Sequence, residues 1–297
     1  MLDFTLSLYY NRVMKEAKTS TTEKNSYRFK LFSDARSYIG MGFEENPPNS
    51  LFYRHIHHDI EIFVLLEGTG IFAIENERYN LSNSCIIVIP AGIYHYYEKI
   101  DEGFRANAVI NLEKNTLKKM GLYGIVSNLI ETGPIFDTSS SPSLCSLLTK
   151  PLSKIGVLDE EKMSLYFSSV IQQFLLELGS EDFSARQKEV AQSEITQQIV
   201  SYINDNLDKP LSLKYIAKGL FLSQSYISHK FLSDMRIGVM AYVKAKRIAQ
   251  AKILMQKGIK PTEVFSQIGF NDYTTFFRAF KRDTGVTPSE FYGQIQK

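Results

Sequence analysis

Apolar positions follow two different periods along the chain. Between residues 51 and 111, short runs rich in β-branched and aromatic residues alternate with turn-forming clusters such as 67–70 (EGTG) and 82–84 (SNS). The expected strands cover residues 60–66, 71–75, 85–89 and 104–111. This alternation predicts a small antiparallel β-barrel or sandwich, preceded by a weakly patterned segment over residues 1–50.

Downstream of residue 111 the apolar period becomes helical. Residues 117–130 form one candidate helical stretch, although two glycines weaken its middle. From Met163 to Leu178 apolar residues recur at spacings of four, three, four and four, which predicts a strongly amphipathic helix. Its apolar face packs either on its own barrel or against the same helix of a second subunit. The polar segment 179–193 is expected to be a linker.

The last third of the chain predicts two helix-turn-helix units joined by a long helix. In the first unit, helices over 195–207 and 213–220 precede a third helix that Ser223 can cap. The long helix covers 239–257 and spans roughly 28 Å at ~1.5 Å per residue. Its apolar side is formed by Met240, Val243, Ile248, Ala251, Leu254 and Met255, and its other faces carry Lys244, Lys246, Arg247 and Lys252. Adjacent major grooves on one face of DNA are about 34 Å apart, so one chain can read two segments of one site.

Turn and capping residues divide the second unit, over residues 261–292, into three short helices. The expected caps and turns are Thr262, Gly269, Asn271 or Asp272, Gly285, and a capping box of Thr287 and Glu290 around Pro288. Phe276, Ala279 and Phe280 form one apolar stripe that must be buried.

The same unit carries three motifs in order: GF at 269–270, FFRAFK at 276–281 and GVTPSEFY at 285–292. Together they resemble the signature of the AraC/XylS family of transcription regulators, and the match covers about the last hundred residues. Phe265 and Phe277 depart from the family, which usually has alanine and a small polar residue at these positions. Local helix packing and base preference depend on these two departures.

In that family, exposed residues of the third and sixth helices enter the major groove. The DNA-binding candidates carried over on this basis are Gln224, Ser225, Ser228, His229, Lys230, Tyr273, Thr274, Phe277, Arg278 and Lys281. Arg278 can bind guanine O6 and N7 bidentately, whereas Lys230 and Lys281 are expected to contact phosphates. Residues 195–297 hold fifteen Lys and Arg against seven Asp and Glu, a formal charge of +8, while the rest of the chain carries −6. A basic C-terminal third is typical of a protein that binds a polyanion.

Four of the five histidines fall in the predicted β-region, at positions 55, 57, 58 and 95. The segment 55–68, with His at 55 and 57, Glu at 61 and Gly at 68, resembles the first cupin motif. The segment 90–95, with Pro at 90, Gly at 92 and His at 95, resembles the core of the second. Asn49, Ser84 and Lys99 depart from these motifs.

Side chains at positions i and i+2 of a strand share a face, so His55, His57 and Glu61 can converge with His95 from a neighbouring strand. Such a set is suited to Zn, Fe, Mn or Ni, and a divalent metal is the one cofactor the sequence suggests. The alternative is a polar cavity for an organic effector, lined by the same residues together with Tyr94 and its neighbouring tyrosines. A further alternative is that the histidines only cap strands with satisfied hydrogen bonds.

Only Cys85 and Cys145 are present, too few for a disulfide framework, and a reduced cytoplasmic protein is expected. The N-terminus lacks the basic and apolar regions of a signal peptide. No stretch approaches eighteen uninterrupted apolar residues, so no membrane span is expected.

These observations predict an α+β multidomain protein, with an N-terminal cupin-like antiparallel β-barrel and following helices. An all-α C-terminal domain then holds two helix-turn-helix units joined by a long helix. The expected domains are 1–112 (effector-binding β-domain), 113–178 (helical dimerisation or packing region), 179–193 (linker) and 194–297 (DNA-binding domain).

The expected function is sequence-specific transcription regulation under the control of a small-molecule effector, for which the family resemblance suggests a sugar. The expected partners are double-stranded DNA, the effector and a second copy of the chain, with RNA polymerase as a further candidate. Two alternatives stay open. One is a constitutive DNA-binding regulator whose β-domain only dimerises, and the other is a metal-dependent cupin enzyme.

Overall fold

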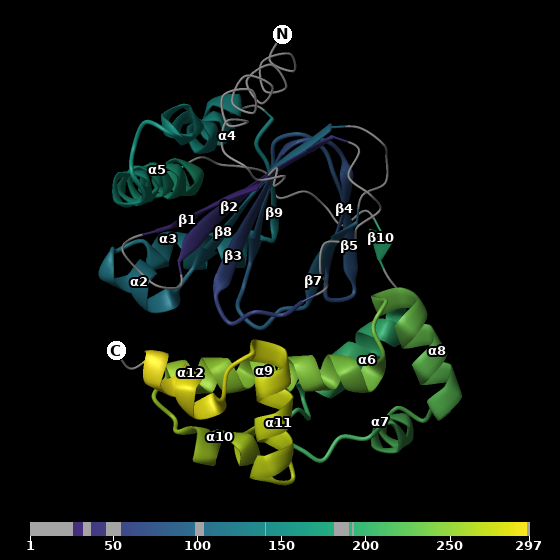
Figure 1. Ribbon diagram of the computed structural model, residues 1–297. Helices are drawn as coiled ribbons and strands as arrows, with labels where there is room; N and C mark the ends of the chain where they lie inside the picture. The colour runs from purple at the N-terminus through teal and green to yellow at the C-terminus, as the bar shows by residue number, and fades with distance from the viewer. Residues whose placement is uncertain are drawn as a thin grey trace.

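The computed structural model describes residues 26–31, 37–45, 55–98, 104–139, 141–180, 190–191 and 193–295. Figure 1 shows a β-rich part with helices along one side, and below it a part built only of helices. The predicted fold class is therefore confirmed. Among the residues described, no helix is both long and apolar enough to cross a bilayer.

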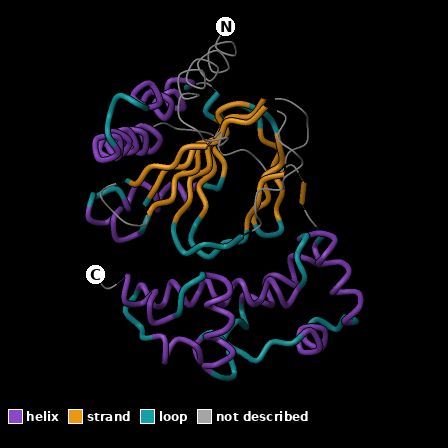
Figure 2. Tube along the Cα trace, viewed as in Figure 1, coloured by secondary structure: helices purple, strands orange, loops and turns teal. Residues whose placement is uncertain are grey.

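The β-rich part consists of two antiparallel sheets that face each other, as the strands in Figure 2 show. Its strands are β1 (Ser26–Lys30), β2 (Tyr38–Glu45), β3 (Ile60–Glu67), β4 (Gly70–Ile74), β5 (Glu77–Leu81), β6 (Cys85–Ile89), β7 (His95–Glu98), β8 (Phe104–Leu112), β9 (Ile135–Asp137) and β10 (Val190–Ala191). One sheet has the order β1-β2-β8-β3-β6-β9 and the other the order β10-β5-β4-β7.

Strand β3 explains why the central strands are apolar on both faces. Ile62 and Val64 pack into one core with the helices that cover the outside of the larger sheet. Phe63 and Leu65, on the opposite face, pack into a second core with residues of the smaller sheet. Because successive side chains of a strand alternate between faces, a strand between two cores reads as a continuous apolar run.

The first helical group packs onto the β-rich part. It contains α2 (Lys114–Lys119), α3 (Tyr123–Thr132), α4 (Pro142–Thr149), the 3₁₀ helix η1 (Lys150–Lys154) and α5 (Glu160–Ser180). The apolar face of α5, including Met163, Phe167 and Phe174, is buried against its own β-domain. Of the two packing arrangements considered for this helix, the structure has the internal one. Leu165 and Leu176 of the same helix remain exposed.

The C-terminal part holds seven helices among the described residues. They are α6 (Glu194–Asn204), α7 (Leu213–Gly219), α8 (Gln224–Met235), α9 (Val239–Gln256), α10 (Pro261–Gln267), α11 (Tyr273–Thr284) and α12 (Pro288–Ile295). Helix α9 lies between the β-rich part and the helices below it (Figure 1).

Several predicted boundaries differ from the structure. The stretch 117–130 is two helices, because a turn at 120–122 separates α2 from α3. Strand β9 follows α2 and α3 in the chain and pairs with β6 of the larger sheet. The predicted helical region 113–178 therefore contributes a strand to the β-domain. Most of the predicted linker lies outside the described residues, but β10 at its end pairs with β5. Strands β1, β2, β5, β7, β9 and β10 were not among the predicted ones.

Candidate functional site

Helix α8 has the exposed face predicted for the first recognition helix. The Ser223 hydroxyl accepts a hydrogen bond from the Tyr226 N–H at 3.2 Å and caps the helix. Ile227 and Phe231 are fully buried. The exposed candidates are Gln224, Ser225, Ser228 and His229. Lys230 is partly buried and forms an ion pair with Asp234 at 3.1 Å.

Helix α11 is the second predicted recognition helix. Asp272 caps it by accepting the Thr275 N–H at 2.7 Å, and Gly285 ends it at φ +78°. The predicted stripe of Phe276, Ala279 and Phe280 is buried. On the other face, Thr274, Arg278 and Lys281 are exposed.

Tyr273 and Phe277 are only partly exposed, so packing accounts for part of each side chain. The Tyr273 ring lies 5.8 Å from that of Phe265 and 6.3 Å from that of Phe277, between centroids. Phe265, where the resembling family usually has alanine, is therefore accommodated by an aromatic partner on α11.

The capping of α10 differs from the prediction. Thr262 was expected to be the N-cap, but the cap is Lys260, and Pro261 occupies the first turn. Proline is favoured there because its fixed φ suits a helix and its missing N–H is not needed. The capping box of α12 is confirmed, since the Thr287 N–H donates to Glu290 at 2.7 Å and the Glu290 N–H donates to Thr287 at 3.2 Å.

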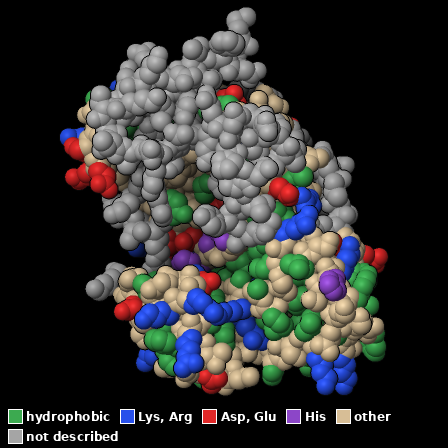
Figure 3. Space-filling model, turned by 45° about the vertical axis from the view of Figure 1, so that its right-hand side comes forward, with side chains coloured by type: hydrophobic (Ala, Val, Ile, Leu, Met, Phe, Trp, Pro, Cys, Tyr) green, Lys and Arg blue, Asp and Glu red, His purple; other side chains and the backbone are tan. Residues whose placement is uncertain are grey.

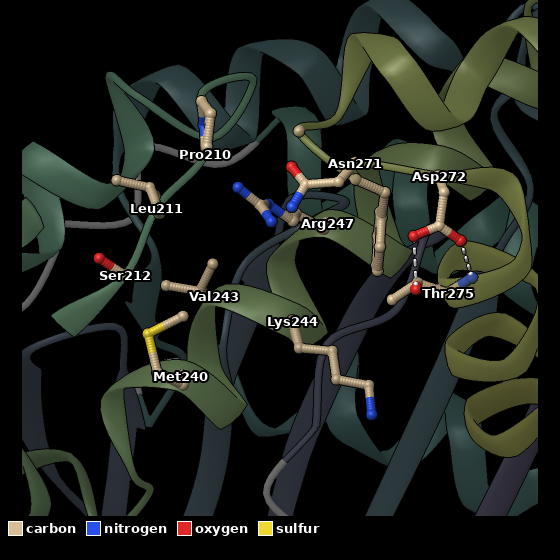
Figure 4. Close-up of a pocket in the computed structure, with 12 residues that line it drawn as sticks. Pro210, Leu211, Ser212, Met240, Val243, Lys244, Arg247, Asn271, Asp272 and Thr275 are labelled. Atoms are coloured by element: carbon tan, nitrogen blue, oxygen red, sulfur yellow. Dashed lines mark hydrogen bonds between the residues drawn. The ribbon is translucent and has the colours of Figure 1, made fainter.

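Arg247 and Gly269 hold the two helix-turn-helix units together. The Arg247 guanidinium donates from Nε to the Leu207 carbonyl at 3.0 Å and also to the Lys209 carbonyl. Gly269, at φ +77°, lies against both carbonyls and the guanidinium, so a side chain there would overlap them. Figure 4 shows the pocket of about 400 Å³ at this junction, with Arg247 projecting between Pro210 on one side and Asn271 on the other.

The apolar and basic positions predicted along α9 differ from the structure at three residues. Lys246 and Arg247 are each only 8% exposed, whereas Met240, expected on the apolar side, is 41% exposed. The reason is that α9 is covered on more than one side, and both cations are used to join it to other elements. Elsewhere, Lys and Arg side chains gather on the surface of the helical C-terminal part, as Figure 3 shows.

The predicted histidine cluster forms in the β-domain. The backbones of His55 and His95 pair as an isolated antiparallel bridge, and Glu61 projects from β3. Nε2 of His57 lies 2.9 Å from the Glu61 carboxylate, Nε2 of His95 3.5 Å and Nε2 of His55 3.8 Å. One ligand atom from each of the four residues lies within 4.8 Å of the others. His58 packs instead against Phe291 of α12.

Burial and charge set the electrostatics of this cluster. Burial raises the pKa of the Glu61 carboxyl, but the facing rings of His55, His57 and His95 outweigh it and hold the pKa well below its usual range. Burial lowers the pKa of the His95 imidazole below its ordinary value, and Glu61 opposes this only in part. The cluster thus combines a carboxylate with a buried imidazole.

A cavity of about 250 Å³ opens beside the cluster. Its lining includes His55, Glu61 and His95 together with Tyr38, Phe63, Phe72, Tyr96, Tyr97 and Val109. Tyr94, which was expected to line the cavity, is not among these residues. It precedes β7, and its hydroxyl donates to the Met235 carbonyl of α8 at 3.2 Å. Because side chains alternate along an extended segment, Tyr94 and His95 point to opposite sides.

Glu75 joins the β-domain to the connecting helix α9, a contact that was not predicted from the sequence. The residue lies in the turn between β4 and β5 at φ +52°. Its carboxylate accepts hydrogen bonds from Lys246 at 2.8 Å and from the Tyr242 hydroxyl, both in α9. Lys246 also donates to the Gly92 carbonyl at 2.8 Å, and the Gly92 N–H donates to the His57 carbonyl at 2.8 Å. The cluster is therefore two hydrogen bonds away from α9.

Comparison with known proteins gives two family matches. Residues 39–117 match the AraC-like ligand binding domain, and residues 216–294 match a helix-turn-helix domain. The transcriptional regulator YdiP of Escherichia coli is 23% identical over 256 residues, which cover 82% of this chain and 81% of YdiP. The arabinose operon regulatory protein of Escherichia coli is 38% identical over 92 residues, covering 30% of this chain and 32% of that protein. A crystal structure of ToxT from Vibrio cholerae covers 91% of this chain and 96% of its own, with 15% identity and a TM-score of 0.39.

Proposed function

Because the chain belongs to the AraC family of transcription regulators, we propose that it recognises one DNA site through α8 and α11 together. Like the relatives named above, it is a DNA-binding regulator and not an enzyme. The observation that carries the proposal is that two capped helices expose polar faces on one scaffold, joined by α9 and fixed by Arg247. Such a scaffold presents both helices to DNA at a constant separation.

The proposed contacts follow from exposure and chemistry. Base-edge contacts come from Ser225, Ser228, His229, Thr274 and Arg278, with Tyr273 and Phe277 offering their exposed edges to thymine methyl groups. Lys281 is exposed and serves a phosphate. Lys230 reaches a phosphate only by leaving Asp234, so it contributes less.

Selection of bound fragments from a random DNA library by the full chain tests this proposal. We expect an enriched site with two conserved segments about one helical turn apart, and footprinting should protect both. DNA binding that weakens with salt but enriches no sequence would overturn the proposal. Such binding would come only from attraction between the basic domain and the DNA phosphates.

We propose the cavity beside the histidine cluster as the effector site, with His55, His57, Glu61 and His95 as its polar groups. A volume of about 250 Å³ suits a small ligand, because sites for drug-sized molecules span about 300–1,000 Å³. Sugars are the first class to test, since one relative regulates the arabinose operon. The melting temperature of the full chain, measured with each member of a panel of sugars, identifies the class of effector. His57→Ala is the control, because it should abolish a shift caused by binding at this site. A flat panel would favour the constitutive regulator.

The proposed route from effector to DNA runs through the contact between Glu75 and Lys246. A ligand that moves His57 or His95 changes the segment that holds Gly92 and Tyr94, and these residues contact α9 and α8. Effector control then consists of a shift between docked and undocked positions of the DNA-binding helices. In Glu75→Gln we expect the effector still to bind but no longer to change DNA binding.

We further propose a homodimer through the outer face of α5, where Leu165 and Leu176 are 59% and 53% exposed and eleven residues apart. Residues at this spacing lie on the same side of a helix. Sedimentation of a Leu165→Glu, Leu176→Glu variant should report monomers, whereas Val157→Glu, another exposed apolar position, should leave the dimer intact. RNA polymerase contact and a cytoplasmic location stay proposals that rest on the family alone.

A further inference from the structure

The rings of His57 and His95 are held in one tautomer by the backbone. Nδ1 of His57 lies 2.8 Å from the Asp59 carbonyl oxygen, and Nδ1 of His95 lies 2.9 Å from the Ile93 carbonyl oxygen. A carbonyl oxygen only accepts hydrogen bonds, so each ring must carry its proton on Nδ1. In a neutral ring, Nε2 then carries a lone pair.

Both of these lone pairs face the Glu61 carboxylate. The distances are 2.9 Å from Nε2 of His57 and 3.5 Å from Nε2 of His95. Nε2 of His95 is buried and has no hydrogen-bond donor among the described residues. While both rings are neutral, the carboxylate and the two ring nitrogens all accept and repel one another, and either a second proton on a ring or a metal cation between them removes the conflict.

We propose that His55, His57, Glu61 and His95 bind one divalent transition-metal ion at the inner end of the cavity. Three imidazoles and one carboxylate favour Zn²⁺, Fe²⁺, Ni²⁺ or Cu²⁺, whereas Mg²⁺ and Ca²⁺ prefer ligand sets made of oxygen atoms. The carbonyls of Asp59 and Ile93 supply the outer hydrogen bonds that typically orient metal-bound histidines.

The surroundings suit entry of an ion and binding of one further ligand. The His55 side chain is 43% exposed, so it borders a path from solvent, whereas Glu61 is 5% exposed. The cavity side of the cluster is lined by Phe63, Phe72 and Tyr97, and the Tyr97 hydroxyl donates to the Thr69 carbonyl at 2.6 Å. The ion would therefore be either the effector or the anchor for a small oxygen-donor effector. This inference deepens the effector site proposed above.

The test uses the full chain, purified without a polyhistidine tag and stripped with a chelator. Co²⁺ is added back, and the visible absorption of the bound ion is titrated while elemental analysis gives the stoichiometry. We expect one Co²⁺ per chain, displaced by Zn²⁺ but not by millimolar Mg²⁺ or Ca²⁺. His57→Ala and His95→Ala should each weaken binding by more than about 100-fold.

His58→Ala is the matched control, because this histidine neighbours the cluster in sequence but packs against Phe291. It should bind Co²⁺ as the wild type does. Melting of each variant without metal shows whether it is folded, and Glu61→Gln, which keeps the side-chain volume, provides a second test of the ligand set. Absence of stoichiometric binding, or equal binding by all variants, overturns the inference. DNA selection run in parallel separates the two proposals. A chain that fails to bind metal but still selects a DNA sequence refutes only the metal site.

Discussion

The side chains of the proposed recognition surface and those of the histidine cluster are positioned in opposite ways. On α8 and α11 most of the candidate side chains are exposed, so their positions depend on the scaffold behind them. In the cluster, the side chains are close together and hold one another, with two rings fixed by carbonyl oxygens. The first region therefore depends on contacts far from its functional atoms, and the second on contacts adjacent to them.

This difference predicts where mutations act. Changes in the scaffold of the DNA-binding part should alter both recognition helices at once, while changes in the cluster should stay local unless they pass through Glu75.

The largest effect is expected for Gly269→Ala. An added Cβ would overlap the Leu207 carbonyl oxygen and lie 2.8 Å from that of Lys209, and the residue has φ +77°. Positive φ and backbone overlap together should cost about 3–4 kcal/mol of unfolding free energy. Urea unfolding followed by circular dichroism measures the loss.

Gly285→Ala is a matched control for this change, because Gly285 has φ +78° but open space around its α-carbon. It should cost only about 1 kcal/mol. The difference between the two variants isolates the close approach of the two helix-turn-helix units. Equal costs would mean that the units are not held together at this point.

The next effect is expected for Lys246→Met, which removes the buried partner of Glu75. The two side chains are 9% and 13% exposed, and breaking a buried pair leaves one charge without its partner, so a cost of about 2–3 kcal/mol is expected. Calorimetry should show the β-domain and the DNA-binding domain unfolding separately. Lys252→Met, in the same helix, breaks a pair with Asp283, which is 40% exposed, and should cost about 0.5 kcal/mol. A single transition in Lys246→Met would contradict the proposed connection.

The sequence was most informative where function depends on exposure and local capping. The stripe at Phe276, the cap at Asp272 and the stop at Gly285 are all encoded within a few residues, so helix α11 and its exposed face could be predicted. The convergence of the histidines on Glu61 was also predicted, although His57 lies in the irregular segment before β3 and not on a strand. These features depend on short-range periodicity.

Contacts between distant segments could not be predicted in the same way. Lys246 and Arg247 were expected away from the apolar side of α9, because a cation in a helix is normally solvated and no local pattern identifies its buried partner. Their partners lie 171 and 40 residues away, at Glu75 and Leu207. Tyr94 was assigned to the cavity because it adjoins His95, although strand alternation directs it to α8. Strand β9 pairs with β6 only after two helices intervene.

Within the recognition surface, Arg278 and Lys281 should respond differently to truncation. Arg278→Ala should cost about 1–3 kcal/mol of binding to the selected site and relax preference at one or two base pairs. Lys281→Ala should weaken selected and random DNA alike and lower the salt dependence by about one counterion. Fluorescence anisotropy on both DNA types at several salt concentrations measures these effects. Parallel losses for both variants on both DNA types would refute the division into base and phosphate contacts.

The smallest effect concerns two serine caps of similar geometry. Ser212 caps α7 by accepting the Tyr215 N–H at 3.1 Å, and Ser223 caps α8 by accepting the Tyr226 N–H at 3.2 Å. Either serine replaced by alanine should cost about 1 kcal/mol of stability. Only Ser223→Ala frays the first turn of a recognition helix, which carries Gln224 and Ser225, so only this variant should also lose about threefold in DNA affinity. Ser223→Asn, which can still cap, should restore it. Equal affinities for the two alanine variants would mean that the first turn of α8 does not contact DNA, which would leave Ser228 and His229 as the contacts from this helix.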